Sequence, residues 1–459
     1  MLPAETKSWL DENYSVLKSH ENTRVVPAVQ SLREQAFVQL IEHGFPTTRN
    51  EDWKYTNITP LLKSAFQLQT KLTIASDVKT RLNALAACYP DYPRIVFVNG
   101  IYSAELSELP AGDNDSFLVR PFSKIATGRN GAQELLETHL GKIASAQLPF
   151  VAFNTAFLAD GVLISTKQSK QQQHVQKPVH LVFITSSDVA QTVTHPRVLI
   201  LLGGGSELQV IEHHLGLSAE VVLTSSVTEA MLGPAANCTY YRVVEEGRST
   251  VHISNLHVSQ EAHSRFSSHL LSIGGALARN EIHVTFRGEG CESRLAGLTI
   301  ANGSQHVDNH TVLDHQVAHC QSNQQYKGIY GGRSEGVFSG TIIVRPQAQK
   351  TNAFQASNSL LLSTEAMSES RPQLKIWADD VRCTHGATVG QLDNEALYYL
   401  RSRGIPETAA RAMLVEAFSG EILDQIELPE HRDVVRALVS ASLAELLGGS
   451  NRERTNGKA

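Results

Sequence analysis

The chain has 459 residues, of which 41% are hydrophobic and 19% are charged. This composition is typical of a folded protein with a substantial core and excludes a disordered chain, and the length predicts roughly three domains. With 40 basic and 46 acidic side chains the net charge is −6, so we expect neither nucleic acid nor a membrane surface as the main partner.

The N-terminus and the cysteines indicate a reducing compartment. Glu5 and Asp11 stand where a leader peptide would be basic or apolar, and the longest aliphatic run, residues 198–202, is too short to span a membrane. Five cysteines in a chain of this length do not form a disulfide framework. They are Cys88, Cys238, Cys291, Cys320 and Cys383, with no Cys-x-x-Cys among them. We expect a cytoplasmic protein with reduced thiols.

Residues 1–150 are predicted to form a helix-rich α+β domain. Apolar residues recur at helical spacing between Val29 and Ile41, and Gly44-Phe45-Pro46 ends that helix. Residues 94–102 combine β-branched and aromatic side chains with the turn pair Asn99-Gly100, which predicts a strand that turns back on itself.

Residues 151–390 consist of short β runs punctuated by Gly, Ser and Asn, for example at 197–202, 251–254 and 340–344. This stretch is too long for an ordinary sandwich. It favours a stacked β-solenoid of about ten coils, at ~20–25 residues per coil. Because no strict repeat is visible, a large barrel or two sandwiches remain alternatives.

Residues 391–448 are predicted to form a C-terminal helical domain. Asp393 is placed to cap a first helix, Pro406 to open a second and Pro429 to open a third. Gly448-Gly449 is expected to stop the third helix. The polar tail, residues 449–459, is expected to be disordered.

Two motif searches bear on catalysis and nucleotide binding. The chain contains no G-x-x-x-x-G-K-[ST], so any ATP dependence must come from a partner. Gly332-Arg333-Ser334-Glu335-Gly336 matches the G-x-S-x-G elbow of hydrolases, which requires a helix directly after the serine. The following residues, 337–344, predict a strand, so a glycine-rich turn is the preferred interpretation.

Four histidines cluster before Cys320: His306, His310, His315 and His319. Together with Asp308 and Asp314 they offer ligands for a metal ion. Their spacings of 4, 5 and 4 residues fit neither one helix face nor strand alternation. A metal site and a set of structural histidines on successive coils both remain open, and the structural interpretation is favoured.

Cys383 and His385 form the sharpest local pattern. Two residues apart, they project to one face of an extended strand, and a thiolate beside an imidazole suits zinc, iron or an iron–sulfur cluster. Asp379 or Asp380 is placed to orient the imidazole. The alternative is a buried cysteine beside a hydrogen-bonded histidine. Because a cluster needs about four ligands, any further ligands must come from elsewhere or from another chain.

The chain resembles the SufB/SufD family of iron–sulfur cluster assembly proteins over most of its length. The resemblance is carried by residues 308–312, 325–329, 336–340, 349–353, 378–390 and 397–405, and by an N-terminal block from Gly44 to Thr56. Two departures separate the chain from SufB. It has His385-Gly386 where SufB-like chains have His-Glu, and Ser357 near the position of a functional cysteine. The chain is thus similar to the SufD branch.

The resemblance implies a right-handed parallel β-helix between an N-terminal and a C-terminal helical domain. It also implies a complex with SufB, paired through the ends of the two β-helices, and with the ATPase SufC on the C-terminal helices. ATP would act only through SufC. No cofactor is expected to stay bound to this chain alone; a nascent iron–sulfur cluster would be shared with SufB. Homodimerisation in the absence of SufB is left open.

Carried onto this chain, the resemblance makes His385 the first candidate for cluster assembly and Cys383 the second. The strand expected to pair with SufB comprises Ala378, Asp379, Asp380, Val381 and Arg382. The surface expected to contact SufC lies within residues 393–425, with Arg401, Arg403, Phe418 and Glu421 as candidates.

Two other classes of protein compete with this interpretation. Many β-helix proteins cleave carbohydrates, but these are usually exported and aromatic-rich, whereas this chain has 6% aromatic residues. A subunit that only stabilises SufB and supplies no ligand is the second alternative. We expect no catalytic activity of the chain itself.

Overall fold

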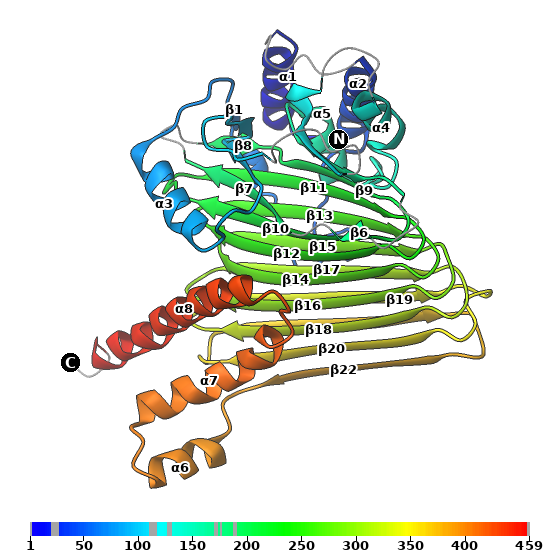
Figure 1. The fold of residues 1–459 in the computed structure, drawn as a ribbon. Coiled ribbons are helices and arrows are strands. Elements are labelled where there is room, and N and C mark those ends of the chain that lie inside the picture. The colour runs from blue at the N-terminus through cyan, green and yellow to red at the C-terminus, as the bar shows by residue number, and fades with distance from the viewer. Residues whose placement is uncertain are drawn as a thin grey trace.

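The computed structural model describes residues 2–19, 27–109, 117–125, 131–168, 173–174, 177–186 and 191–456. Its centre is a β-solenoid of about seven turns over residues 179–390, as the sequence predicted (Figure 1). In each turn the chain follows one strand of a first sheet, passes a corner and follows one strand of a second sheet. The two stacks of parallel strands face each other and enclose the core.

Sheet A contains the strands of one wall. In spatial order from the C-terminal end they are β21 (Met367–Ile376), β19 (Glu335–Val344), β17 (His306–His315), β15 (Leu277–Phe286), β13 (Val251–Gln260), β11 (Val222–Leu232), β9 (Arg197–Leu202), β5 (Val162–Thr166) and β4 (Phe117–Pro121). β8 (Thr192–Thr194) also pairs with β11, and β1 (Gln67–Leu68) pairs with β8.

Sheet B forms the other wall. Its strands are β22 (Arg382–Gly390), β20 (Asn352–Leu361), β18 (Gln321–Tyr330), β16 (Glu292–Ala301), β14 (Arg265–Gly274), β12 (Asn237–Glu246), β10 (Ser206–Gly216), β7 (Val179–Thr185), β2 (Arg94–Val98) and β3 (Ile101–Tyr102), with β6 (Gln173–His174) beside β10. All pairs are parallel except β2–β3 and β4–β5.

The expected number of coils was wrong. Phe266 pairs with Ser293, 27 residues later, and Ser322 pairs with Ala353, 31 residues later. Each turn holds two strands of about ten residues and two corners, so it needs more chain than the coil length assumed from sequence. The solenoid therefore has about seven turns instead of ten.

Alternation along each strand separates the core from the outer faces. On β14, Phe266 and Leu270 point into the solenoid, whereas Leu271 and Ile273 point outward. Both sides of the strand are buried because helices cover the outer face, which explains the nearly continuous apolar runs.

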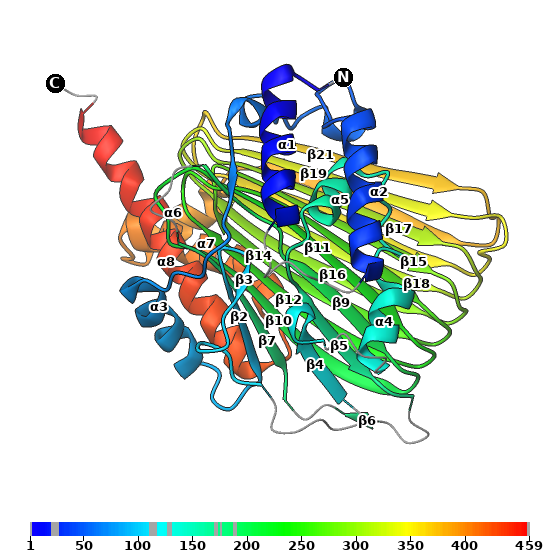
Figure 2. The same ribbon diagram turned by 90° about the horizontal axis from the view of Figure 1, so that it is seen from above.

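The N-terminal segment covers the outer face of sheet A (Figure 2). Trp9, Phe45, Phe150 and Phe153 pack with sheet A residues such as Leu223. The helices of this segment are α1 (Ala4–Ser19), α2 (Pro27–His43), α4 (Gly131–His139) and α5 (Pro149–Ala156), with short 3₁₀ helices η2 (Glu51–Trp53), η3 (Leu61–Lys63) and η4 (Phe122–Lys124). The expected helix around residues 29–41 and the strand turn at Asn99-Gly100 are both present. The expected boundary at residue 150 falls within α5.

Helices from both ends of the chain cover the outer face of sheet B. They are α3 (Ser76–Ala87), α7 (Glu407–Leu423) and α8 (Pro429–Asn456), while α6 (Asn394–Ser402) packs against α7. Val435, Val439 and Leu443 of α8 meet Leu271 and Leu298 of the sheet. Among the described residues, no helix is long and apolar enough to cross a membrane.

The third C-terminal helix is longer than predicted. It continues through Gly448-Gly449 to Asn456, so the backbone of residues 449–456 is helical rather than a disordered tail. Two glycines cost roughly 2 kcal/mol of helix propensity, which good helix formers on both sides can offset. Residues 457–459 of the predicted tail lie outside the described residues.

Candidate functional site

β22 is the last strand of sheet B, and among the described strands its outer edge has no partner. Cys383 pairs with Ala353 and His385 with Gln355. Cys383 packs against the interior cluster, so alternation places His385 on the same, inward-facing side of the strand. The His385 side chain lies exposed at this open end. Burial raises the pKa of the Cys383 thiol, which therefore stays protonated at neutral pH.

The expected pairing strand at residues 378–382 is only partly a strand. Ala378, Asp379, Asp380 and Val381 form the corner between β21 and β22, and Arg382 is the first residue of β22. Two consecutive aspartates favour a turn at this position. Asp380 forms an ion pair with Lys350 across the corner, and the hydrogen bonds of the described residues include none between Asp380 and His385. The contact of this segment with a partner stays a prediction.

The open end of the solenoid carries large exposed apolar side chains. Phe354, Met367, Trp377 and Val389 are between 43% and 58% exposed, and all come from the last strands or the corner between them. Exposed apolar groups together with an unpaired strand edge are typical of a surface that associates with another chain.

The four candidate SufC contacts divide into two pairs. Phe418 and Glu421 on α7 hold that helix on sheet B through one residue, Lys327. The Lys327 ammonium lies 4.4 Å from the centre of the Phe418 ring and 2.6 Å from the Glu421 carboxylate. Arg401 and Arg403 lie at the end of α6, where Arg403 covers the ring of Tyr399.

The histidines before Cys320 lie in separate environments. His310 Nδ1 accepts from the Arg279 guanidinium at 2.8 Å, so its lone pair is already used. His315 is buried, bonds Ser322 at 3.0 Å and stacks on Phe286. His319 is exposed at a corner with φ = 62°. His306 contacts Thr56 and Glu335. The described residues thus do not bring His310, His315 and His319 together as ligands.

Arg279 is the centre of the contact between the N-terminal segment and this part of sheet A. Its guanidinium lies 4.0 Å from the centre of the Trp53 ring and forms ion pairs with Asp308 and Glu281. Thr56 donates to Asp308 at 2.6 Å. The sequence blocks around Trp53 and Asp308 therefore meet in the folded chain and form one structural contact.

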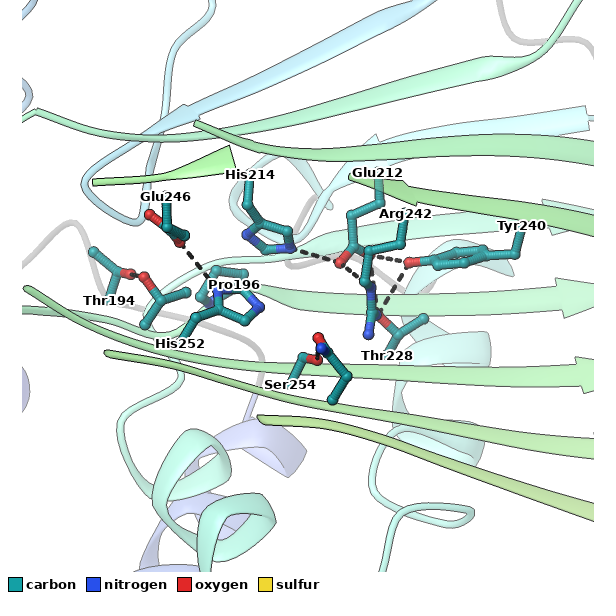
Figure 3. Close-up of polar contacts among 12 residues, drawn as sticks. Thr194, Pro196, Glu212, His214, Thr228, Tyr240, Arg242, Glu246, His252 and Ser254 are labelled. Carbon is teal, nitrogen blue, oxygen red and sulfur yellow. Dashed lines mark hydrogen bonds and ion pairs between the residues drawn. The ribbon is translucent and has the colours of Figure 1, made fainter. Parts of the chain in front are cut away.

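Figure 3 shows a buried polar network that the sequence analysis missed. Inside the solenoid, Glu212 of β10 receives hydrogen bonds from Tyr240 and Thr228 and lies 2.9 Å from the Arg242 guanidinium. Burial opposes ionisation of Glu212, but Arg242 and His214 outweigh it and hold the pKa of this carboxyl at about 2. Glu212 is therefore an interior carboxylate balanced by an interior guanidinium.

A second carboxylate, Glu246, lies beside this network. Its oxygen is 3.0 Å from His252 Nδ1, and the rings of His252 and His214 meet edge to face with centroids 4.6 Å apart. His214, Glu246 and His252 all are buried and offer ligand atoms within 4.8 Å of one another. His214 precedes Glu246 by 32 residues, and the three residues lie on three strands, so no local spacing pattern could have revealed them.

The parallel solenoid and its end, which is partly apolar and unpaired among the described strands, define a class of protein: a β-solenoid with an open strand edge. Comparison with family models gives the family. The model for the SUF system FeS cluster assembly SufBD core domain matches residues 183–418, and the model for the SufBD protein N-terminal region matches residues 7–181. The chain therefore belongs to the SufBD family, as its resemblance indicated.

Relatives of this family align with the chain over most of their own length. An iron–sulfur cluster assembly SufBD family protein of Synechocystis is 29% identical over 92% of this chain and 96% of its own. The iron–sulfur cluster assembly protein SufD of Escherichia coli is 29% identical over 88% of this chain and 90% of its own. A SufBD family protein of Mycobacterium tuberculosis is 30% identical over 71% of this chain and 80% of its own.

Proposed function

We propose that this chain is a SufD-like, non-ATPase subunit of an assembly with SufB and SufC, and that it pairs with SufB at the open end of its solenoid to complete the site of a nascent iron–sulfur cluster. The observation that carries the proposal is the unpaired edge of β22 with an exposed His385. The likeness to SufD of Escherichia coli supports it.

The edge strand supplies the mode of pairing. A free parallel strand presents backbone N–H and C=O groups that a strand of another chain can satisfy. The exposed side chains of Met367 and Trp377 lie at the same end, and burying them in an interface would lower the free energy of the complex. Pairing at this end would bring groups of SufB next to His385.

The ligand chemistry requires a second chain. Cys383 and His385 supply two donors at most, and an iron–sulfur cluster takes about four. A coordinating thiol must lose its proton, and the raised pKa of Cys383 makes this costly in the free chain. His385, which is exposed, is therefore the first candidate ligand and Cys383 the second.

For SufC we propose docking on α6 and the adjoining face of α7. Tyr398 and Tyr399 are 75% and 58% exposed, and Met413 is 47% exposed. Arg401 and Arg403 flank these aromatic residues, a composition that protein interfaces favour. Phe418 and Glu421 contribute indirectly, because they fix α7 on sheet B. The sequence contains no P-loop, so ATP would be hydrolysed by SufC.

The test is anaerobic co-purification of this chain with SufB and SufC of the same organism, with iron and sulfide measured against subunit stoichiometry. His385→Ala is compared with His43→Ala, a matched loss of an exposed histidine at the end of α2. We expect the three subunits to co-elute in every case and iron to fall several-fold only in His385→Ala.

Other outcomes would contradict parts of the proposal. Equal iron in an intact His385→Ala complex would make this chain a supporting subunit without a ligand. Failure of the wild-type chain to bind either partner would reject the assembly role and reopen the carbohydrate-cleaving alternative, which the family match does not support. A stable homodimer that excludes SufB would assign the open edge to a second copy.

A further inference from the structure

The interior of the solenoid contains one more carboxylate than guanidinium in the network around β10 and β12. Glu212 is paired with Arg242. Among the described residues, the ion-pair partner of Glu246 is His252 alone. The other Glu246 oxygen accepts a long hydrogen bond from the Thr185 hydroxyl, at 3.5 Å. The Glu246 side chain is 1% exposed, and burying a carboxylate without a guanidinium, an ammonium group or a metal ion beside it is costly.

We propose that His214, Glu246 and His252 bind a single divalent transition-metal ion, Fe²⁺ or Zn²⁺, inside the solenoid. Two imidazoles and one carboxylate with their ligand atoms within 4.8 Å of one another form a donor set that both ions accept. The site is distinct from the open end at β22, because its ligands lie on β10, β12 and β13.

The surroundings match those of a metal ligand set. His214 Nε2 lies 2.7 Å from the Glu212 carboxylate, which fixes the ring and leaves Nδ1 as the ligand atom. The distance of 3.0 Å between His252 Nδ1 and the Glu246 oxygen is compatible with two donors on one ion. Among the described residues, His252 Nε2 is a buried nitrogen without a hydrogen-bond partner, so it is free to act as a ligand atom in place of Nδ1.

The corner that carries Glu246 borders a cavity. Glu246 ends β12 at a corner and lines a cavity of about 490 Å³ between the ends of the sheet B strands and α8. Gly216 allows the carboxylate to lie close to the backbone, because a Cβ at this position would lie 2.6 Å from the Glu246 oxygen.

The test uses the purified full-length chain, freed of metal by a chelator and titrated anaerobically with Co²⁺ as a spectroscopic probe. We expect the chain to bind one equivalent of Co²⁺, and the bound ion to show the absorption of a low-coordinate site with nitrogen ligands. Glu246→Gln and His252→Gln should weaken binding at least tenfold. His315→Gln, which removes another interior histidine held by Ser322, should bind like the wild type. Parallel titrations with Fe²⁺ and Zn²⁺ then decide which ion is preferred.

The proposal is overturned if the wild-type chain takes up no stoichiometric metal, or if Glu246→Gln binds Co²⁺ as tightly as the wild type. If the variants do not fold, the wild-type chain still decides. Its melting temperature should rise by several degrees with one equivalent of Zn²⁺, and an unchanged melting temperature would exclude a bound ion. Because this test needs neither SufB nor SufC, its failure leaves the proposed assembly role untouched.

Discussion

Arg197 and Glu229 form an ion pair between two side chains that are 0% exposed. Glu229 also accepts hydrogen bonds from the backbone of Gly141, Ile143 and Ala144, so one carboxylate joins the N-terminal segment to sheet A. Removing it would leave three buried amides without an acceptor and the buried guanidinium without a counter-ion, with hydrogen bonds only to Asn154 and Thr155. Such losses are far larger than those of exposed pairs, where water replaces the partner.

We therefore predict that Glu229→Ala lowers the free energy of unfolding by about 3–5 kcal/mol. The control is Glu105→Ala, which removes an ion pair with Lys79 whose two side chains are 50% and 60% exposed. This variant should lose less than about 1 kcal/mol. Urea unfolding followed by circular dichroism measures both. Equal losses in the two variants would show that the buried pair contributes no more than a surface pair.

For single residues, the sequence predicted correctly which side chains share one side of a strand, because this depends only on their spacing along the chain. Cys383 and His385 lie on one side of β22 as their spacing predicted, because alternation depends only on the strand itself. His214, Glu246 and His252 could not be found in this way, because their proximity depends on the register between strands and on the corner between β12 and β13.

At the scale of elements, α8 is attached to sheet B through an unusual polar contact. His431, in the first turn of α8, is 1% exposed and lies 2.8 Å from the Tyr89 hydroxyl, with the ring of Tyr241 beside it. Burial, together with nearby His213 and His269, lowers the pKa of His431 to about 3. The helix therefore docks with a neutral imidazole.

Acid should weaken this docking. Between pH 6.5 and pH 3 the unfolded chain protonates this histidine and the folded chain does not, so stability is complete above pH 6.5 and falls as the pH decreases. From pH 7 to pH 5 the loss due to His431 should be roughly 2 kcal/mol. His431→Phe should be less stable at pH 7 because Tyr89 loses its hydrogen-bond partner. Between pH 7 and pH 5, however, its free energy of unfolding should fall by roughly 2 kcal/mol less than that of the wild type. Urea unfolding at both pH values measures the difference; equal losses would contradict the prediction.

The corners explain why the repeat is invisible in the sequence. Ala235, His263, Gly290, His319 and Lys350 occupy the same corner of successive turns, and all have positive φ between 57° and 70°. Only one of them is glycine, although this backbone conformation favours glycine. The stacking of turns imposes the conformation on different residue types, so neither the turn length nor the structural role of His319 could be predicted from residue identity.

At the scale of the whole molecule, the solenoid is a one-dimensional stack in which each turn contacts mainly its neighbours. The β nature of residues 179–390 was predictable from composition and alternation, and the flanking helices were predictable from apolar spacing and from residues such as Asp393 and Pro429. The two ends of the solenoid differ (Figure 1). The N-terminal helices lie over the first turns, whereas β22 at the other end remains uncovered among the described elements.

This asymmetry predicts a gradient of hydrogen exchange in the free chain. Amides of β12 and β14 have strands on both sides and should exchange slowest, and those of β22 should exchange fastest among the solenoid strands, because about half of its amides face away from β20. Addition of SufB should slow exchange in β22 and leave β12 unchanged, as measured by mass spectrometry of peptides from the full-length chain.

Slow exchange in β22 before SufB is added would show that a second copy already occupies the edge, and the concentration dependence of that protection would identify the homodimer. Protection by SufB confined to α6–α8 would instead place its contact on the helices and reject pairing through the strand.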